Sequence, residues 1–152
     1  MTRILIEKSK RLLTVWQDGK TVLRCPAALG AQPTGHKRLE GDGKTPEGVY
    51  YICLKRETGK YGCALGISYP SLRDARRAAE DGRLDGALLP LFAEAERERK
   101  RPPWGTPLGG EIYIHGGGAQ SDWTAGCVAL EQKNMAELFA LCHEGDTVEI
   151  IP

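Results

Sequence analysis

Apolar and polar side chains alternate over the first thirty residues, which is the pattern of a sheet with one buried face. The apolar positions are Ile4, Ile6, Leu13, Val15, Val22 and Leu23. The charged run at 8–11 and the pair Asp18-Gly19 interrupt the alternation where tight turns are favoured. We therefore expect two successive hairpins at the start of the chain. The 19 glycines and 9 prolines indicate many further turns, which excludes a simple helical bundle.

A length of 152 residues predicts one domain over 1–152. After the first thirty residues, the sequence pattern predicts several more strands and three helices. Strands are expected at 49–54, 65–69, 111–115 and 147–151. Helices are expected at about 72–80, from Pro90 to 101, and at 134–141. Ser71 and Asp74 have the spacing of a capping box for the first helix. The fold class predicted is therefore mainly β, a β-rich α+β fold with about three helices.

The segment at about 71–103 is predicted to be a helical insertion, and its role stays open. Its charged end at 98–101 is typical of a helix face in contact with water. The alternative is a segment that overhangs a site, with arginines that meet an acidic substrate.

Charge and hydropathy exclude several classes of protein. The 21 basic and 20 acidic residues give a net charge of +1, which gives no case for nucleic acid or a membrane surface as partner. The longest apolar stretch, 86–93, is broken by Pro90 and is far shorter than the roughly 18 residues of a membrane span. The glycine-rich segment 41–48 does not match a phosphate-binding loop and is interpreted as a turn.

The five cysteines contain no C-x-x-C pair, and their number is odd. This pattern favours neither a zinc ribbon nor a fully paired disulfide framework. We expect no metal and no other cofactor, and at least one free thiol. His36 lies in a polar loop and is expected to be solvated, while Cys142 and His143 are neighbours on a helix and should point in different directions.

His115 and Cys127 are the candidate catalytic pair. A cysteine attacks a carbonyl only as a thiolate, so it needs a base nearby. The strand 111–115 ends on His115, three glycines follow, and Cys127 comes 12 residues later in a segment of small side chains. Gly126 permits backbone N–H groups to converge on one point, as an oxyanion hole requires. Taken singly, each residue also fits a plain core position, so the combination carries the prediction.

The segment Ile114-His115-Gly116, followed by Asp-Trp-Thr-Ala-Gly-Cys-Val-Ala-Leu at 122–130, resembles the catalytic signature of the L,D-transpeptidase family, the YkuD domain. The segments 41–50 and 67–70 resemble further blocks of its branch of YafK-like murein transpeptidases. The resemblance covers most of the chain, and the block from histidine to cysteine is its specific part. It implies the catalytic β-sandwich of that family.

Carried over residue by residue, the resemblance makes Cys127 the nucleophile and His115 its base. Thr124 and Ala125 become supporting positions, and the amides of Gly126 and Cys127 become donors to the oxyanion. The implied substrate-binding residues are Gly116, Trp123 and Tyr69.

This chain departs from the family pattern at two positions. Ala125 stands where the motif has a histidine, and Ala129 stands where an arginine often does. In the family, that histidine acts largely through its backbone carbonyl, which orients the base, and Ala125 also offers a carbonyl. The arginine is implicated in binding the donor, so Ala129 affects donor contacts more than the chemistry.

The implied function is a cysteine L,D-transpeptidase that acts on tetrapeptide stems of peptidoglycan. The implied partners are a donor stem, which forms a thioester, and an amine acceptor, which resolves it. One alternative uses water as the acceptor, giving an L,D-carboxypeptidase or amidase, and another is a silent wall-binding module. The family implies the bacterial envelope, whereas the N-terminus is interpreted as a strand and not as an export signal. The sequence leaves the compartment and the oligomeric state open.

Overall fold

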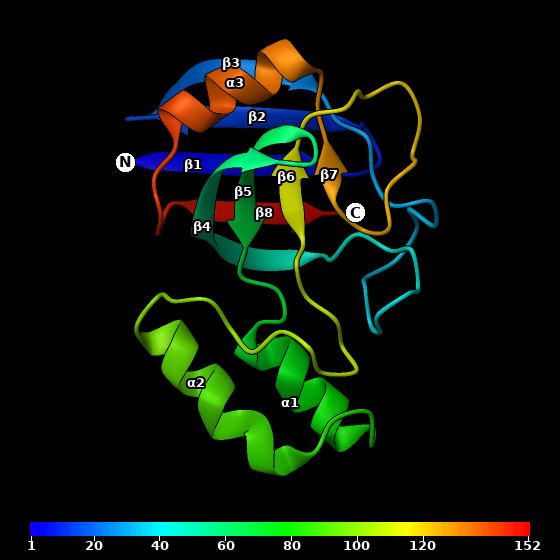
Figure 1. Cartoon of the computed structure of the whole chain (residues 1–152). Coiled ribbons are helices and arrows are strands. Elements are labelled where there is room, and N and C mark those ends of the chain that lie inside the picture. The colour runs from blue at the N-terminus through cyan, green and yellow to red at the C-terminus, as the bar shows by residue number, and fades with distance from the viewer.

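The computed structural model describes all 152 residues and shows a curled sheet with three α-helices (Figure 1). The strands are β1 (Thr2–Glu7), β2 (Leu12–Gln17), β3 (Lys20–Pro26), β4 (Gly48–Gly59), β5 (Gly62–Ile67), β6 (Tyr113–His115), β7 (Val128–Ala129) and β8 (Thr147–Ile151). Their order in the sheet is β3-β2-β1-β8-β4-β5-β6-β7. The mainly β fold class is confirmed, and the two hairpins expected at the start are β1-β2 and β2-β3.

The long strand β4 makes the sheet curl. Its first residues pair with β8 and its later residues pair with β5, with register shifts after Ile52 and Arg56. Such irregularities bend a strand and increase its twist. At the far end, Ala28 exchanges two backbone hydrogen bonds with Ala129, of 2.8 and 2.9 Å. The chain after β3 therefore covers the β7 edge, and the sheet closes on itself.

The main core fills the inside of this curl. The alternating residues of the first hairpin, Ile4, Ile6, Leu13 and Val15, are fully buried in it. The helix α3 (Gln132–Leu141) adds Met135 and Leu138 to the same core. It begins two residues before the predicted start at 134.

Residues 68–112 leave the sheet between β5 and β6 and carry α1 (Leu72–Glu80), the short 3-10 helix η1 (Gly86–Leu88) and α2 (Leu89–Arg97). These elements lie beyond the sheet in Figure 1. They have a small core of their own, made of Ala75, Ala78, Leu84, Phe92 and Leu108. The predicted span of α1 is confirmed, as is the capping box of Ser71 and Asp74. That the chain is one domain with an insertion at about 71–103 stays a prediction.

Some predicted boundaries were wrong for local reasons. The helix α2 ends at Arg97 and not at 101, because Arg99 takes a left-handed conformation and the Lys100 N–H bonds back to the Ala95 carbonyl. This is the hydrogen-bonding of a helix end. The strand expected from 111 begins at Tyr113, because Glu111 also has a positive φ, of 53°. None of the helices has the length and apolar character needed to cross a membrane.

Candidate active site

The parallel pair β6·β7 brings His115 and Cys127 to one face of the sheet. Ile114 is opposite Val128, and His115 is opposite Ala129. Ile114 and Val128 are fully buried in the core. Because side chains alternate along strands, His115 and the residue just before β7, Cys127, lie together on the other face. The two candidate residues thus share a face of the strand pair, with Cys127 level with Tyr113 and His115 two positions further along, opposite Ala129.

The Cys127 thiol is partly exposed and is held by backbone groups. Its Sγ accepts the Tyr113 N–H at 3.4 Å and donates to the Glu111 carbonyl at 3.6 Å. No hydrogen bond joins Sγ to the His115 ring. Burial raises the pKa of Cys127 above its ordinary value, while the Tyr113 N–H and the Lys37 charge oppose that shift. The resting sulfur is therefore a thiol that needs a base to ionise.

The His115 ring is oriented as a base. Its Nδ1 lies 2.6 Å from the Gly116 carbonyl oxygen. A carbonyl only accepts, so Nδ1 carries the proton and Nε2 is left as the acceptor. Burial lowers the pKa of His115, which keeps the ring neutral near pH 7. The carbonyl that orients this histidine in the structure belongs to Gly116, and the part of the Ala125 carbonyl stays a prediction.

Two aromatic rings surround His115. Tyr61, in the turn between β4 and β5, stacks on the imidazole with ring centres 4.5 Å apart, and Trp123 packs edge-on at 5.6 Å. Gln132 ties this arrangement together, since its amide accepts the Gly117 N–H at 3.0 Å and donates to the Tyr61 carbonyl at 2.8 Å. The same Gln132 amide fills the space that a Gly116 side chain would need.

A hollow of about 450 Å³ lies beside these rings. It is lined by Tyr61, Gly117, Gly118, Gln120, Ser121, Trp123 and Glu131. Trp123 lines this hollow and Gly116 precedes the lining residue Gly117, while their part in substrate binding stays a prediction. Tyr61 was missed. The two glycines around Lys60-Tyr61 indicate a turn, but the sequence alone does not show that the turn folds over His115.

The turn before Cys127 is fixed by Thr124. Its hydroxyl donates to the Cys127 carbonyl at 2.6 Å and accepts the Gly126 N–H at 3.1 Å. The Gly126 amide is therefore already bonded, which corrects the expectation that it donates to an oxyanion. The Cys127 N–H makes no hydrogen bond within the protein and stays a candidate oxyanion donor. Gly126 has a φ of 146°, and a Cβ there would lie 2.8 Å from the Lys44 carbonyl oxygen.

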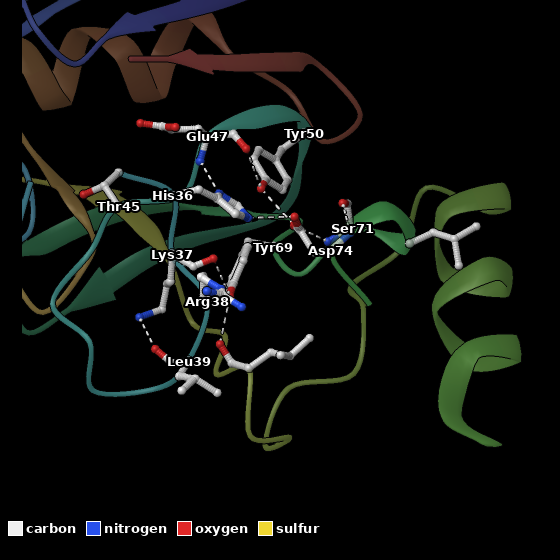
Figure 2. A network of polar contacts seen from close by, with 12 residues as sticks. His36, Lys37, Arg38, Leu39, Thr45, Glu47, Tyr50, Tyr69, Ser71 and Asp74 are labelled. Carbon is white, nitrogen blue, oxygen red and sulfur yellow. Dashed lines mark hydrogen bonds and ion pairs between the residues drawn. The ribbon is translucent and has the colours of Figure 1, made fainter. Parts of the chain in front are cut away.

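Tyr69 and His36 lie in a polar network that also includes Lys37, shown in Figure 2. Tyr69 is 1% exposed, and its hydroxyl donates to the Leu108 carbonyl at 2.9 Å. Tyr69 therefore has a structural part here, and its place in substrate binding stays a prediction. His36 is not a solvated loop residue. Its Nδ1 accepts the Glu47 N–H at 2.8 Å, and its Nε2 donates to Asp74 at 2.9 Å.

Asp74 joins α1 to the loop at 36–47. Besides His36, its carboxylate accepts the Tyr50 hydroxyl at 2.9 Å and the Ser71 N–H at 3.0 Å. Burial raises the pKa of Asp74, but these donors outweigh it, so the pKa lies below its ordinary value. The loop is held from the other side by the buried Lys8, which donates to the Thr45 carbonyl at 2.7 Å.

The change Asp74→Ala should lower the free energy of unfolding by about 3 kcal/mol, because it leaves buried donors without an acceptor. Chemical denaturation at neutral pH measures this loss. Ser71→Ala is the matched control, because it removes a single capping bond worth about 1 kcal/mol. An Asp74→Ala variant no less stable than Ser71→Ala would contradict the part assigned to this carboxylate.

The other four cysteines are not candidate nucleophiles. Cys25, Cys53 and Cys142 are buried, and burial raises their pKa values to about 11, 12 and 12. Cys63 is partly exposed and contacts the Met135 carbonyl. No three His, Cys, Asp or Glu side chains lie together as a candidate metal site.

The family model of YkuD, the L,D-transpeptidase catalytic domain, matches residues 1–150. The chain therefore belongs to the YkuD family of L,D-transpeptidase catalytic domains. No curated protein sequence matches the chain.

Solved structures show the same fold. The helical cell shape determining protein Pgp2 from Campylobacter jejuni is 26% identical, with a TM-score of 0.69 over 98% of this chain and 46% of that one. An L,D-transpeptidase from Mycobacterium smegmatis is 13% identical, with a TM-score of 0.58 over 99% of this chain and 58% of that one. Bd1075 of Bdellovibrio bacteriovorus is 22% identical, with a TM-score of 0.60 over 99% of this chain and 47% of that one. The chain thus spans about half the length of these proteins.

Proposed function

We propose that this domain is a cysteine L,D-transpeptidase that acts on tetrapeptide stems of peptidoglycan through a thioester on Cys127. The observation that carries the proposal is the oriented His115 ring, with Nδ1 bonded to the Gly116 carbonyl and Nε2 free, on the same sheet face as a partly exposed thiol. A cysteine nucleophile needs a base with a free acceptor nitrogen, and the His115 ring offers one on the face that carries the thiol. The family match supports the class of substrate.

The first half of the proposed reaction forms the thioester. The Cys127 side chain turns from the Glu111 carbonyl toward the imidazole, and Nε2 of His115 takes the thiol proton. The thiolate attacks the carbonyl carbon of the third residue of the stem, and the Cys127 N–H stabilises the oxyanion. The C–N bond to the terminal D-residue then breaks, and the leaving amine takes the proton from His115.

The second half resolves the thioester. An amine of a second stem gives a proton to His115 and attacks the same carbonyl. The C–S bond breaks, a new amide forms, and the thiol is restored by the proton from the imidazolium. The hollow lined by Tyr61 and Trp123, whose rings pack against His115, is the space we propose for part of the substrate. Water in place of the amine would give a carboxypeptidase.

Products formed from a defined tetrapeptide stem test this proposal. With an amine acceptor present, the enzyme should release the terminal D-residue and form the cross-linked dimer, whereas without it the thioester should persist or hydrolyse slowly. Chromatography with mass detection separates these products. Tripeptide formed at equal rates with and without the amine, and no dimer, would assign the domain as a carboxypeptidase. No release of the D-residue would instead favour the alternative of a catalytically silent wall-binding module.

A further inference from the structure

A buried lysine lies behind the peptide that carries the candidate nucleophile. The Lys37 side chain is 4% exposed, and its ammonium donates to the Leu39 carbonyl at 3.1 Å (Figure 2). It also donates to the Asp42 carboxylate at 2.9 Å. A Cβ built on Gly126 would lie 3.6 Å from Lys37 Nζ. The ammonium thus packs against the residue next to Cys127, and one of its three hydrogens has no acceptor in these two bonds.

We propose that Lys37 is a positioning residue of the active site, the cation that stabilises the Cys127 thiolate from behind the Gly126-Cys127 peptide. The inference rests on the proposed function of Cys127 as the nucleophile. A fixed cation near a sulfur favours its charged form, and its field is stronger where water is excluded.

Few charged groups face Cys127. From the segment before β6, the Glu111 carboxylate raises the pKa of Cys127. His115, on β6, is neutral near pH 7. From the loop at 36–47, Lys37 lowers the pKa of Cys127, with Asp42 as its own partner. Lys37 is therefore the cation available to offset the burial of the sulfur and the Glu111 charge.

The loop is held firmly enough to keep this ammonium in place. His36, the preceding residue, is bonded to Asp74 of α1, and the Tyr69 hydroxyl lies 3.4 Å from the Lys37 carbonyl oxygen. Asp42 accepts the backbone N–H groups of Arg38, Leu39 and Lys44, and although burial raises its pKa, these bonds and Lys37 bring it down to about 2. Asp42 is thus ionised, and the charges of this loop are fixed.

The pH dependence of Cys127 alkylation tests the inference without any substrate. Iodoacetamide is added over a range of pH, and mass spectrometry follows the peptide that contains Cys127. Lys37→Met and Lys37→Gln should slow alkylation near neutral pH by about tenfold and move the profile to higher pH, because both remove the positive charge that favours the thiolate. The Lys37→Gln variant keeps an amide N–H that can donate to the Leu39 carbonyl or the Asp42 carboxylate, so the loop should still fold.

Two controls separate the charge from the shape of the loop. Lys44→Met makes the same chemical change in the same loop, but the Lys44 ammonium lies near Gly35, so alkylation should not change. Asp42→Asn disturbs the same ion pair but leaves the ammonium, so it should not slow alkylation. Lys37 variants that alkylate like the wild type, or an Asp42→Asn variant slowed as much as they are, would overturn the inference. A shift in alkylation without any turnover of stems would uphold it and refute the proposed function instead.

Discussion

Replacing Cys127 by alanine should reduce turnover of a tetrapeptide stem by at least about 10⁴-fold, because no other group in the site can form the acyl bond. The loss should fall on the rate of release of the terminal D-residue, measured by chromatography. Stability should change little, since the thiol is partly exposed and bonds only to backbone groups at 3.4 and 3.6 Å.

The matched control is Cys63→Ala, which removes the other partly exposed thiol. Cys63 lies on β5 and contacts the Met135 carbonyl, away from the β6·β7 face. Its loss should leave turnover unchanged. A Cys127→Ala variant that still releases the D-residue at a comparable rate would remove Cys127 from the mechanism.

His115→Gln should reduce turnover by about 10² to 10⁴-fold, the usual contribution of a general base. Glutamine is close in size and polar, but it cannot take a proton from the thiol. His143→Gln is the control, because that histidine is exposed and belongs to a different end of the fold. Equal turnover in the two variants would contradict the assignment of His115 as the base.

The pH profile gives a second readout of His115. Burial lowers the pKa of its imidazole from the ordinary 6.5, so the neutral, proton-accepting form persists below that pH. The kcat/KM of the wild type should therefore rise with pH through a midpoint below 6.5 and then level off. The free energy of unfolding should change with pH in the same direction. Because folding lowers the pKa of His115, the protein loses stability as pH falls through the His115 transition. A midpoint above 6.5 would contradict a buried neutral base.

Much of the fold could be predicted because its signals are local. The alternation of Ile4, Ile6, Leu13 and Val15 depends only on neighbours in the sequence, and all four are buried as expected. The capping box likewise lies within four residues of the start of α1. The end of α2 was missed because Arg99 adopts a left-handed conformation that its sequence context does not demand.

The site was harder to predict because its contacts join distant parts of the chain. His36 meets Asp74, and Tyr61 meets His115, only after the sheet and the helices have assembled. A loop histidine or a single tyrosine in a turn gives no sign of such a partner. The bond from the Gly126 N–H to the Thr124 hydroxyl is different, since it spans two residues and is typical of serine and threonine turns.

The measurement that tests the central claim most directly is the mass of the intact protein after brief mixing with a tetrapeptide stem. We predict an added mass equal to the stem without its terminal D-residue, carried by the Cys127 peptide and released by hydroxylamine, as a thioester requires. Release of the D-residue with no adduct on Cys127 under rapid quenching, or an adduct on another residue, would contradict this account.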